Sequence, residues 1–216
     1  MTRFFVGITG ASGHAYTEAL VRALIGAGME VDLCATGAGA KVLKHELGVV
    51  AEPDGSLSPE TLRKWLGEEV AAAVRVFAPA AVEAPASSGT SLTGGVLLCP
   101  CSMGTMARVA VGFSSNLVER AADVALKEGK RLIIVPREAP YSEVHIENML
   151  KLSRLGAVIL PASPGFYHHP KSIADLVNHL VGKILDRAGV EHSIGKRWAG
   201  LEPPPADEGI VQGEPG

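Results

Sequence analysis

Five short apolar runs alternate with helical patterns along this chain, and that order limits the fold more than any other feature. Each run has the length and the continuous apolar character of a strand buried on both faces of a sheet. The runs are Arg3 to Thr9, Glu30 to Ala35, Val96 to Cys99, Arg131 to Val135 and Ala157 to Leu160. Because parallel strands need long crossover connections, the helical segments between the runs supply what a parallel sheet requires. The order therefore predicts an α/β fold with helices on both faces of a parallel sheet.

Helical periodicity recurs between and after these runs. It is found at Tyr16 to Ala27, Ala38 to Leu47, Thr105 to Val111, Leu117 to Lys127, Glu143 to Leu155 and Ile173 to Ala188. Two segments break the pattern. Between 48 and 95, Ser58 and Pro59 open one helix, and an Ala-, Pro- and Ser-rich stretch then predicts an extended loop. The Pro-, Gly- and acid-rich C-terminal end predicts a disordered tail over 196–216, after a domain over 1–195.

The amino-acid composition restricts the class of protein further. Of the 216 residues, 47% are hydrophobic and only 5% aromatic, which suits one core of aliphatic side chains in a single domain. Twenty basic and twenty-three acidic residues leave a net charge of −3, with no excess field to attract nucleic acid or an anionic membrane. No apolar run approaches the roughly 20 residues that span a bilayer, and the N-terminus has no signal pattern. We therefore expect a cytoplasmic protein without a membrane or nucleic-acid partner.

The cysteines indicate a reduced protein without a metal. Cys34, Cys99 and Cys101 lie in or at the ends of apolar runs, where a thiol packs as a small hydrophobe. An odd count and a lone Cys-x-Cys complete neither a disulfide framework nor a zinc site. We therefore expect no bound metal.

The first apolar run ends in a turn of small residues, Gly10-Ala11-Ser12-Gly13, directly before a helical pattern. A turn with almost no side chains lets backbone N–H groups approach a ligand, and the helix directs its positive end there. This arrangement suits an anion such as phosphate. The turn lacks the full G-x-G-x-x-G spacing, so a tight connection without a ligand is an equal alternative.

Polar residues also follow the later runs. The stretch Pro100 to Thr105 presents hydroxyls and a helix start to an anion or to the edge of a flavin ring. Arg137 and Glu138 stand between Pro136 and Pro140, after the fourth run. Adjacent charges usually form only a solvated ion pair. Their position at a strand's carboxyl end, where open α/β sheets bind ligands, favours a functional site instead.

Six longer motifs then follow in order. They are Gly-Ile-Thr-Gly-Ala-Ser-Gly at 7–13, Pro-Cys-Ser-Met at 100–103, Asn-Leu-Val-Glu-Arg-Ala-Ala-Asp-Val-Ala-Leu-Lys-Glu at 116–128, Val-Pro-Arg-Glu-Ala-Pro at 135–140, His-Ile-Glu-Asn-Met-Leu at 145–150 and Pro-Gly-Phe-Tyr-His at 164–168. Together they resemble the UbiX family of flavin prenyltransferases. The resemblance covers nearly the whole chain, except part of 50–95 and the last residues.

The resemblance implies a flavodoxin-like or Rossmann-like fold and a prenyltransferase activity. Such an enzyme joins a dimethylallyl group from dimethylallyl phosphate to reduced FMN. The product, prenylated FMN, is the cofactor of UbiD-type decarboxylases, so a decarboxylase of that type is the implied recipient. Family members form large homo-oligomers, dodecamers among them, in which neighbouring subunits complete a site.

The resemblance also assigns roles to residues of this sequence. The FMN-binding set is Gly10, Ala11, Ser12, Thr36, Ser102, Met103, Gly104, Thr105 and Arg137. The set for the prenyl phosphate is Arg120, Lys127, Tyr167, Lys183 and Trp198, the last reaching a neighbour's prenyl pocket. The catalytic set is Ser12, Glu46, Lys127 and Glu138. In it, Glu138 manages a proton at the leaving phosphate, and Glu46, relayed through Ser12, removes protons at the flavin.

Some positions depart from the family pattern. Gly37 stands where the family often has lysine, Val82 lies near a position that can hold tryptophan, and Lys183 stands where arginine also occurs. The adjacent His168 and His169 are interpreted as a solvated turn rather than as metal ligands.

Two other functions remain as alternatives. FMN-dependent cysteine decarboxylases share the Gly-Ala-Ser turn, but their Pro-Ala-Ser-Ala-Asn-Thr and Pro-x-Met-Asn segments are absent here. A non-catalytic FMN carrier would use the same flavin pocket. It would not need the prenyl-phosphate residues, such as Tyr167 and Lys127, that this chain retains.

Overall fold

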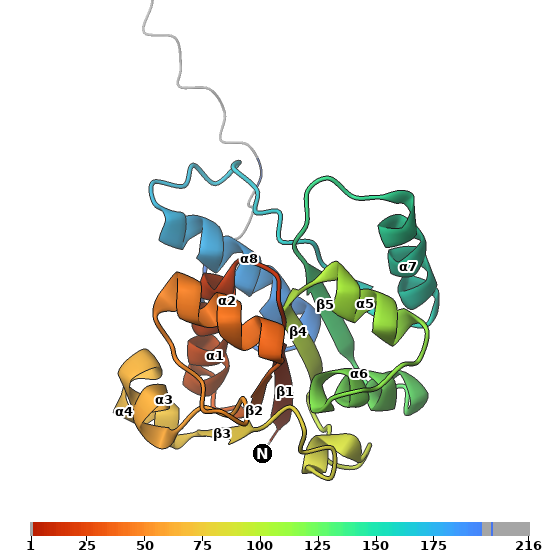
Figure 1. Cartoon of the computed structure of the whole chain (residues 1–216). Coiled ribbons are helices and arrows are strands. Elements are labelled where there is room, and N and C mark those ends of the chain that lie inside the picture. Colours follow the sequence, from red (N-terminus) through yellow and green to blue (C-terminus); the bar gives the residue numbers. More distant parts are fainter. Residues whose placement is uncertain (1, 196–199, 201–216) are drawn as a thin grey trace, which may run out of the picture.

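The computed structural model describes residues 2–195 and 200, and a parallel sheet of six strands runs through its centre (Figure 1). The strands are β1 (Arg3–Ile8), β2 (Glu30–Ala35), β3 (Val74–Phe77), β4 (Gly95–Cys101), β5 (Leu132–Pro136) and β6 (Val158–Ile159). Their order across the sheet is β3-β2-β1-β4-β5-β6, and every neighbouring pair is parallel. The predicted parallel α/β fold is therefore confirmed.

The helices also follow the predicted periodicity closely. They are α1 (His14–Gly26), α2 (Gly37–Leu47), α3 (Pro59–Leu66), α4 (Glu68–Ala72), α5 (Met103–Ala110), α6 (Leu117–Lys127), α7 (Glu143–Arg154) and α8 (Ile173–Ala188), with a short 3₁₀ helix at Pro85–Ser87. Six of them are capped by a side chain that accepts a backbone N–H from the first turn, from Thr36, Ser58, Ser102, Asn116, Ser142 and Ser172. None of the helices in the described range is long and apolar enough to cross a bilayer.

The sheet separates two apolar cores. Because successive side chains of a strand point to opposite faces, Phe4 and Val6 of β1 join one core and Phe5 the other. Helices α1 and α8 cover the first core, and α5, α6 and α7 lie on the opposite side (Figure 1). Both faces of the central strands are therefore buried, which explains their continuous apolar sequence.

The segment between 48 and 95 differs from the prediction. Helix α3 is confirmed, but the extended loop is wrong in part, because this segment also forms α4, β3 and the short 3₁₀ helix. Strand β3 lies at the edge of the sheet beside β2, and only Val74 of its four residues is buried. Arg75 faces outward and pairs with Asp32 (Nη2 to Oδ2, 2.8 Å). An edge strand with such polar content does not produce the continuous apolar run by which the central strands were predicted.

The predicted C-terminal tail includes one predicted site residue, Trp198. Residues 196–216, including Trp198, lie outside the described part of the chain apart from Gly200.

The strand order places the candidate site. From β1 the chain moves to one side of the sheet through β2 and β3, and it returns to the other side of β1 with β4. At such a switch point the connections after the two central strands diverge to opposite faces and leave a crevice at their carboxyl ends. The turns after β1 and β4 meet there.

Candidate active site

Thr9 joins the turns that follow β1 and β4. Its buried hydroxyl donates to the carbonyl of Pro100 (2.9 Å) and accepts from the amide of Ser102 (2.7 Å). The backbone amide of Thr9 also donates to Pro100 (3.3 Å). The small-residue turn and the Pro100–Thr105 stretch are therefore fixed side by side. Sequence analysis missed Thr9, because the residue resembles the last position of an ordinary strand.

Arg137 brings the turn after β5 to the same place. Its Nε donates to the carbonyl of Ser12 (3.3 Å), and its amide donates to the carbonyl of Cys101 (3.3 Å). The side chain is exposed, so the other guanidinium N–H groups can reach a ligand. Three predicted stretches, far apart in sequence, thus meet at one edge of the sheet.

The predicted FMN-binding residues divide by exposure. Ala11, Met103 and Thr105 are buried, whereas Ser12 and Gly104 are exposed at the same edge. The exposed residues can offer side-chain or backbone donors to a ligand, and the buried ones shape the floor of the site. This donor set, of amides, hydroxyls and one guanidinium, suits a phosphorylated flavin.

Helices α2 and α5 both begin at this edge and direct their positive ends toward it. Thr36 caps α2 by accepting from the amide of Gly39 (3.1 Å), and Ser102 caps α5 by accepting from the amide of Thr105 (3.4 Å). A Cβ atom on Gly39 would lie 2.6 Å from the carbonyl oxygen of Ile8. Glycine at this position therefore lets the start of α2 approach β1.

The start of α1 is already occupied by a carboxylate of the protein. Glu46, from α2, accepts from the amides of Gly13 (3.0 Å) and His14 (2.9 Å), and its Oε2 lies 3.2 Å from Nδ1 of His14. These are the amides that the sequence suggested for a bound anion. A phosphate at this edge therefore has the starts of α2 and α5 available, rather than that of α1.

The surroundings of Glu46 hold it ionised. Burial by itself would raise the pKa of this carboxyl. Hydrogen bonds from the Ser12 side chain, from the amides of His14 and Gly13 and from the His14 ring outweigh burial and lower the pKa to about 2. At neutral pH Glu46 is therefore ionised and accepts a hydrogen bond that orients Ser12. Protonation of this carboxylate at neutral pH costs free energy, because its pKa lies far below the pH.

A second cluster lies on the loop after β6 and on α8. The Tyr167 hydroxyl is 3.5 Å from Nε2 of His179, and the His168 ring stacks on the His179 ring with centroids 4.6 Å apart. Burial, then the charges of His168 and Lys183, lower the pKa of His179. Tyr167 and Lys183, predicted to bind one phosphate, thus both lie close to His179. The loop is joined to the turn after β5, because the amide of Ala162 donates to the Pro136 carbonyl (2.9 Å).

His168 lies in a turn, as predicted, but the expectation that its ring is solvated is wrong. Its ring is packed against His179, and both ring nitrogens are buried without a hydrogen-bond partner among the described residues. His169 is exposed, as predicted. Local sequence does not indicate the stack, because His168 and His179 belong to different elements.

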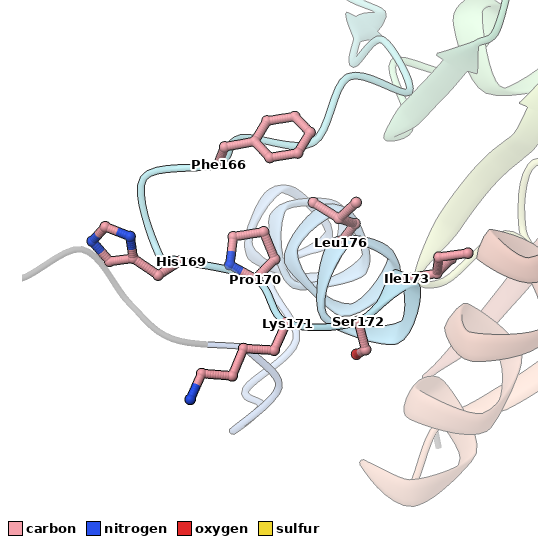
Figure 2. Close-up of a pocket in the computed structure, with 7 residues that line it drawn as sticks. All are labelled: Phe166, His169, Pro170, Lys171, Ser172, Ile173 and Leu176. Atoms are coloured by element: carbon pink, nitrogen blue, oxygen red, sulfur yellow. The ribbon is translucent and has the colours of Figure 1, made fainter.

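An open pocket adjoins this cluster (Figure 2). Phe166 approaches it from the loop, and Ile173 and Leu176 belong to the first turns of α8. Phe166 is 68% exposed and Ile173 80% exposed. Apolar side chains at such exposure suit contact with an apolar group or with another protein surface.

The two predicted residues of α6 pair with neighbouring carboxylates, and Lys127 does not lie at this edge. Arg120 pairs with Asp123 (3.1 Å), and Lys127 pairs with Glu128 (2.5 Å). Lys127 is the last residue of α6, shortly before β5 begins, so it lies at the amino edge of the sheet. Within one chain, Lys127 is therefore separated from the turns around Ser12.

Glu138 remains at the carboxyl edge, next to Arg137. Its side chain is exposed, and Oε1 accepts from the amide of Ala139 (3.0 Å). The other carboxylate oxygen can therefore face a ligand.

An ion pair between the buried Glu119 and the partly exposed Arg108 supports the start of α5. Glu119 of α6 is fully buried and bonds to Nε of Arg108 and to the hydroxyl of Ser115 (2.7 Å). Arg108 in turn donates to the Thr105 hydroxyl (3.4 Å). The sequence did not indicate this pair.

Within the described residues, no three histidine, cysteine or acidic side chains gather in a way that could hold a metal ion.

Comparison with known proteins identifies the family. The Flavoprotein family matches residues 1–185. Flavin prenyltransferase UbiX of Pseudomonas aeruginosa is 45% identical over 199 residues, which cover 91% of this chain and 93% of that protein.

Two solved structures share the fold over nearly their whole length. The crystal structure of AnUbiX (PadA1) in complex with FMN and dimethylallyl pyrophosphate is 35% identical, with a TM-score of 0.81, covering 93% of this chain and 99% of that one. The dodecameric FMN-dependent UbiX-like decarboxylase from Escherichia coli O157:H7 is 38% identical, with a TM-score of 0.80, covering 92% and 100%. This chain therefore belongs to the Flavoprotein family and, within it, to the UbiX flavin prenyltransferases.

Proposed function

We propose that this enzyme joins the dimethylallyl group of dimethylallyl phosphate to reduced FMN and passes the prenylated FMN to a UbiD-type decarboxylase. The observation that carries the proposal is the presence of two separate groups of hydrogen-bond donors, each suited to a phosphate. One consists of the starts of α2 and α5 with Arg137, and the other of Tyr167 and Lys183 around His179. A protein that only stored FMN would need the first arrangement alone.

The first arrangement would hold FMN. Gly10, Ala11 and Ser12 would line the flavin, and Thr36, the Ser102–Thr105 turn and Arg137 would supply donors to its polar groups and phosphate. The reduced flavin supplies the electron-rich ring that the reaction alkylates.

The second arrangement would hold the prenyl phosphate. Cleavage of the allylic carbon–oxygen bond leaves negative charge on the phosphate, which Tyr167 and Lys183 can stabilise as hydrogen-bond donors. Glu138, at the adjacent turn, would give the leaving phosphate a proton or orient the cations around it. Arg120 and Lys127 would come from a neighbouring subunit, because one chain keeps Lys127 at the opposite edge of the sheet.

On the flavin side, bond formation releases protons. Ser12 would take the first of them while passing its own hydroxyl proton to Glu46, because the hydroxyl is hydrogen-bonded to the ionised Glu46 and is exposed at the turn.

A homo-oligomer, with a dodecamer as the assembly we propose, explains an exposed apolar face on α7. Ile146 is 55% exposed and Leu150 49%, and both line a pocket that continues to β6. Contiguous exposed apolar residues of this kind mark protein–protein contacts. Such an assembly would bring α6 of one chain to the site of another.

We expect Leu150→Asp to reduce the mass of the particle measured by light scattering, because a charge at the centre of an apolar contact is costly to bury. Val50→Asp is the matched control, since Val50 is similarly exposed (51%) but lies outside α7. Equal particle masses for Leu150→Asp and the wild type would exclude α7 from the interface.

The experiment that tests the activity compares the two redox states of the flavin. With dimethylallyl phosphate, we expect phosphate release with reduced FMN under anaerobic conditions, and release at background level with oxidised FMN, whose ring is electron-poor. Equal release from both states would contradict the mechanism.

Lys183 should contribute mainly to binding the prenyl phosphate. Lys183→Ala removes a charge-assisted contact worth about 1.5 to 3 kcal/mol, so we expect a roughly 10-fold to 150-fold loss of affinity for dimethylallyl phosphate. Lys183→Arg keeps the charge and should retain most of the affinity. Titration of each variant with dimethylallyl phosphate and, separately, with FMN measures the effect. If Lys183→Ala lost FMN but kept the prenyl phosphate, the assignment would be wrong.

The proposal places the enzyme in the cytoplasm. Cys34, Cys99 and Cys101 are free and buried, and reduced thiols are typical of a reducing compartment.

A further inference from the structure

His14 is a buried polar residue that the proposed roles do not explain. It is the first residue of α1, its side chain is 0% exposed, and Nδ1 lies 3.2 Å from Oε2 of Glu46. On the other side of the ring, Nε2 is buried and has no hydrogen-bond partner among the described residues. An unpaired buried nitrogen is unfavourable, and an apolar side chain of similar size would avoid that cost. The protein nevertheless has a histidine at this position, beside Ser12 and Glu46.

The contact with Glu46 determines which nitrogen of His14 carries the proton. An ionised carboxylate only accepts hydrogen bonds, so Nδ1 must be the donor. Burial lowers the pKa of His14, and the contacts with Glu46 and with the Thr9 backbone offset this only in part, so the ring is neutral at pH 7. A neutral ring with its proton on Nδ1 leaves Nε2 bare, which accounts for the unpaired atom.

We propose that His14 is a positioning residue for the proton relay of Ser12 and Glu46. The ring N–H holds Oε2, together with the amides of Gly13 and His14, and so fixes the carboxylate relative to the Ser12 hydroxyl. The Ser12 proton points to Glu46, and the lone pairs of the hydroxyl are left to face the flavin. His14 itself does not touch a substrate. This inference rests on the proposed function, since the relay matters only if protons leave the flavin.

The test compares His14→Leu with His14→Asn. Leucine fills the space without a donor, whereas the asparagine amide places an N–H near the position of Nδ1. We expect His14→Leu to slow the single-turnover formation of prenylated FMN about 10-fold to 150-fold, the factor for losing one hydrogen bond to a charged group. Affinities for FMN and dimethylallyl phosphate should stay at wild-type values. His14→Asn should recover the rate to within a few-fold of the wild type.

A double-mutant cycle separates positioning from a general effect on the fold. If His14 acts through Glu46, adding His14→Leu to Glu46→Gln should change the rate far less than it does in the wild-type background. An unchanged rate in His14→Leu, or an equal loss in both backgrounds, would overturn the inference. If His14→Leu does not fold, His14→Gln replaces it, because its amide lies near Nε2 and cannot take the place of the Nδ1 donor. Absence of product from the wild type would instead refute the proposed function.

Discussion

Glu138→Gln should bind FMN as the wild type does and form prenylated FMN about 100-fold to 10,000-fold more slowly, the usual contribution of general acid or base assistance. The carboxylate stands at the end of β5 beside Arg137, and its Oε1 accepts from the amide of Ala139. Glutamine keeps that acceptor, so the local backbone should not change. Only the ability to give or take a proton is lost.

Single-turnover kinetics with reduced FMN measures this effect, and an FMN titration checks binding. Glu143→Gln is the matched control, because Glu143 is an exposed carboxylate in the first turn of α7. A Glu138→Gln rate within a few-fold of the wild type would remove Glu138 from the mechanism.

Glu46→Gln should lower the free energy of unfolding by about 2 to 3 kcal/mol at pH 7. The carboxylate is stabilised in the folded state, where its pKa falls from 4.5 to about 2, and each unit corresponds to about 1.4 kcal/mol. Its side chain is 22% exposed, which reduces the effect somewhat. Because the folded pKa lies below the unfolded one, the stabilisation is complete above pH 4.5 and is lost as the pH falls through 2.

Urea unfolding of the two proteins between pH 3 and pH 7 tests this dependence. The difference between wild type and Glu46→Gln should shrink toward the acidic end of the range. Glu52→Gln, at an exposed carboxylate, serves as the control. A difference that stayed constant with pH would show that the amides at the start of α1 do not stabilise the charge.

The strands that are buried on both faces could be predicted from the sequence. Strands β1, β4 and β5 lie inside the sheet, so both of their faces are apolar and the runs are continuous. Strand β3 lies at the edge, and Arg75 interrupts its apolar character, so a loop was expected there. The strand was missed because an edge strand is partly exposed to solvent and therefore does not need apolar residues at every position.

The site was predictable to the level of turns, but not of contacts. The small-residue turn and the hydroxyl-bearing stretch Pro100 to Thr105 follow from local sequence. The occupation of the α1 start by Glu46 does not, because the two groups are brought together only by the packing of α1 and α2. For the same reason, the sequence did not indicate the contact between His14 and Glu46.

Lys127 shows a different limit of prediction from a sequence motif. A motif assigns a residue to a site but does not say which chain supplies it. The end of α6 lies at the amino edge of the sheet, so the assigned role requires a second copy of the chain.

The central claim is the transfer of a prenyl group to reduced FMN, and mass spectrometry of the flavin tests it most directly. After anaerobic incubation of the enzyme with reduced FMN and dimethylallyl phosphate, we predict a flavin whose mass has increased by one dimethylallyl unit. Recovery of unmodified FMN alone, from enzyme that binds both substrates, would contradict the account.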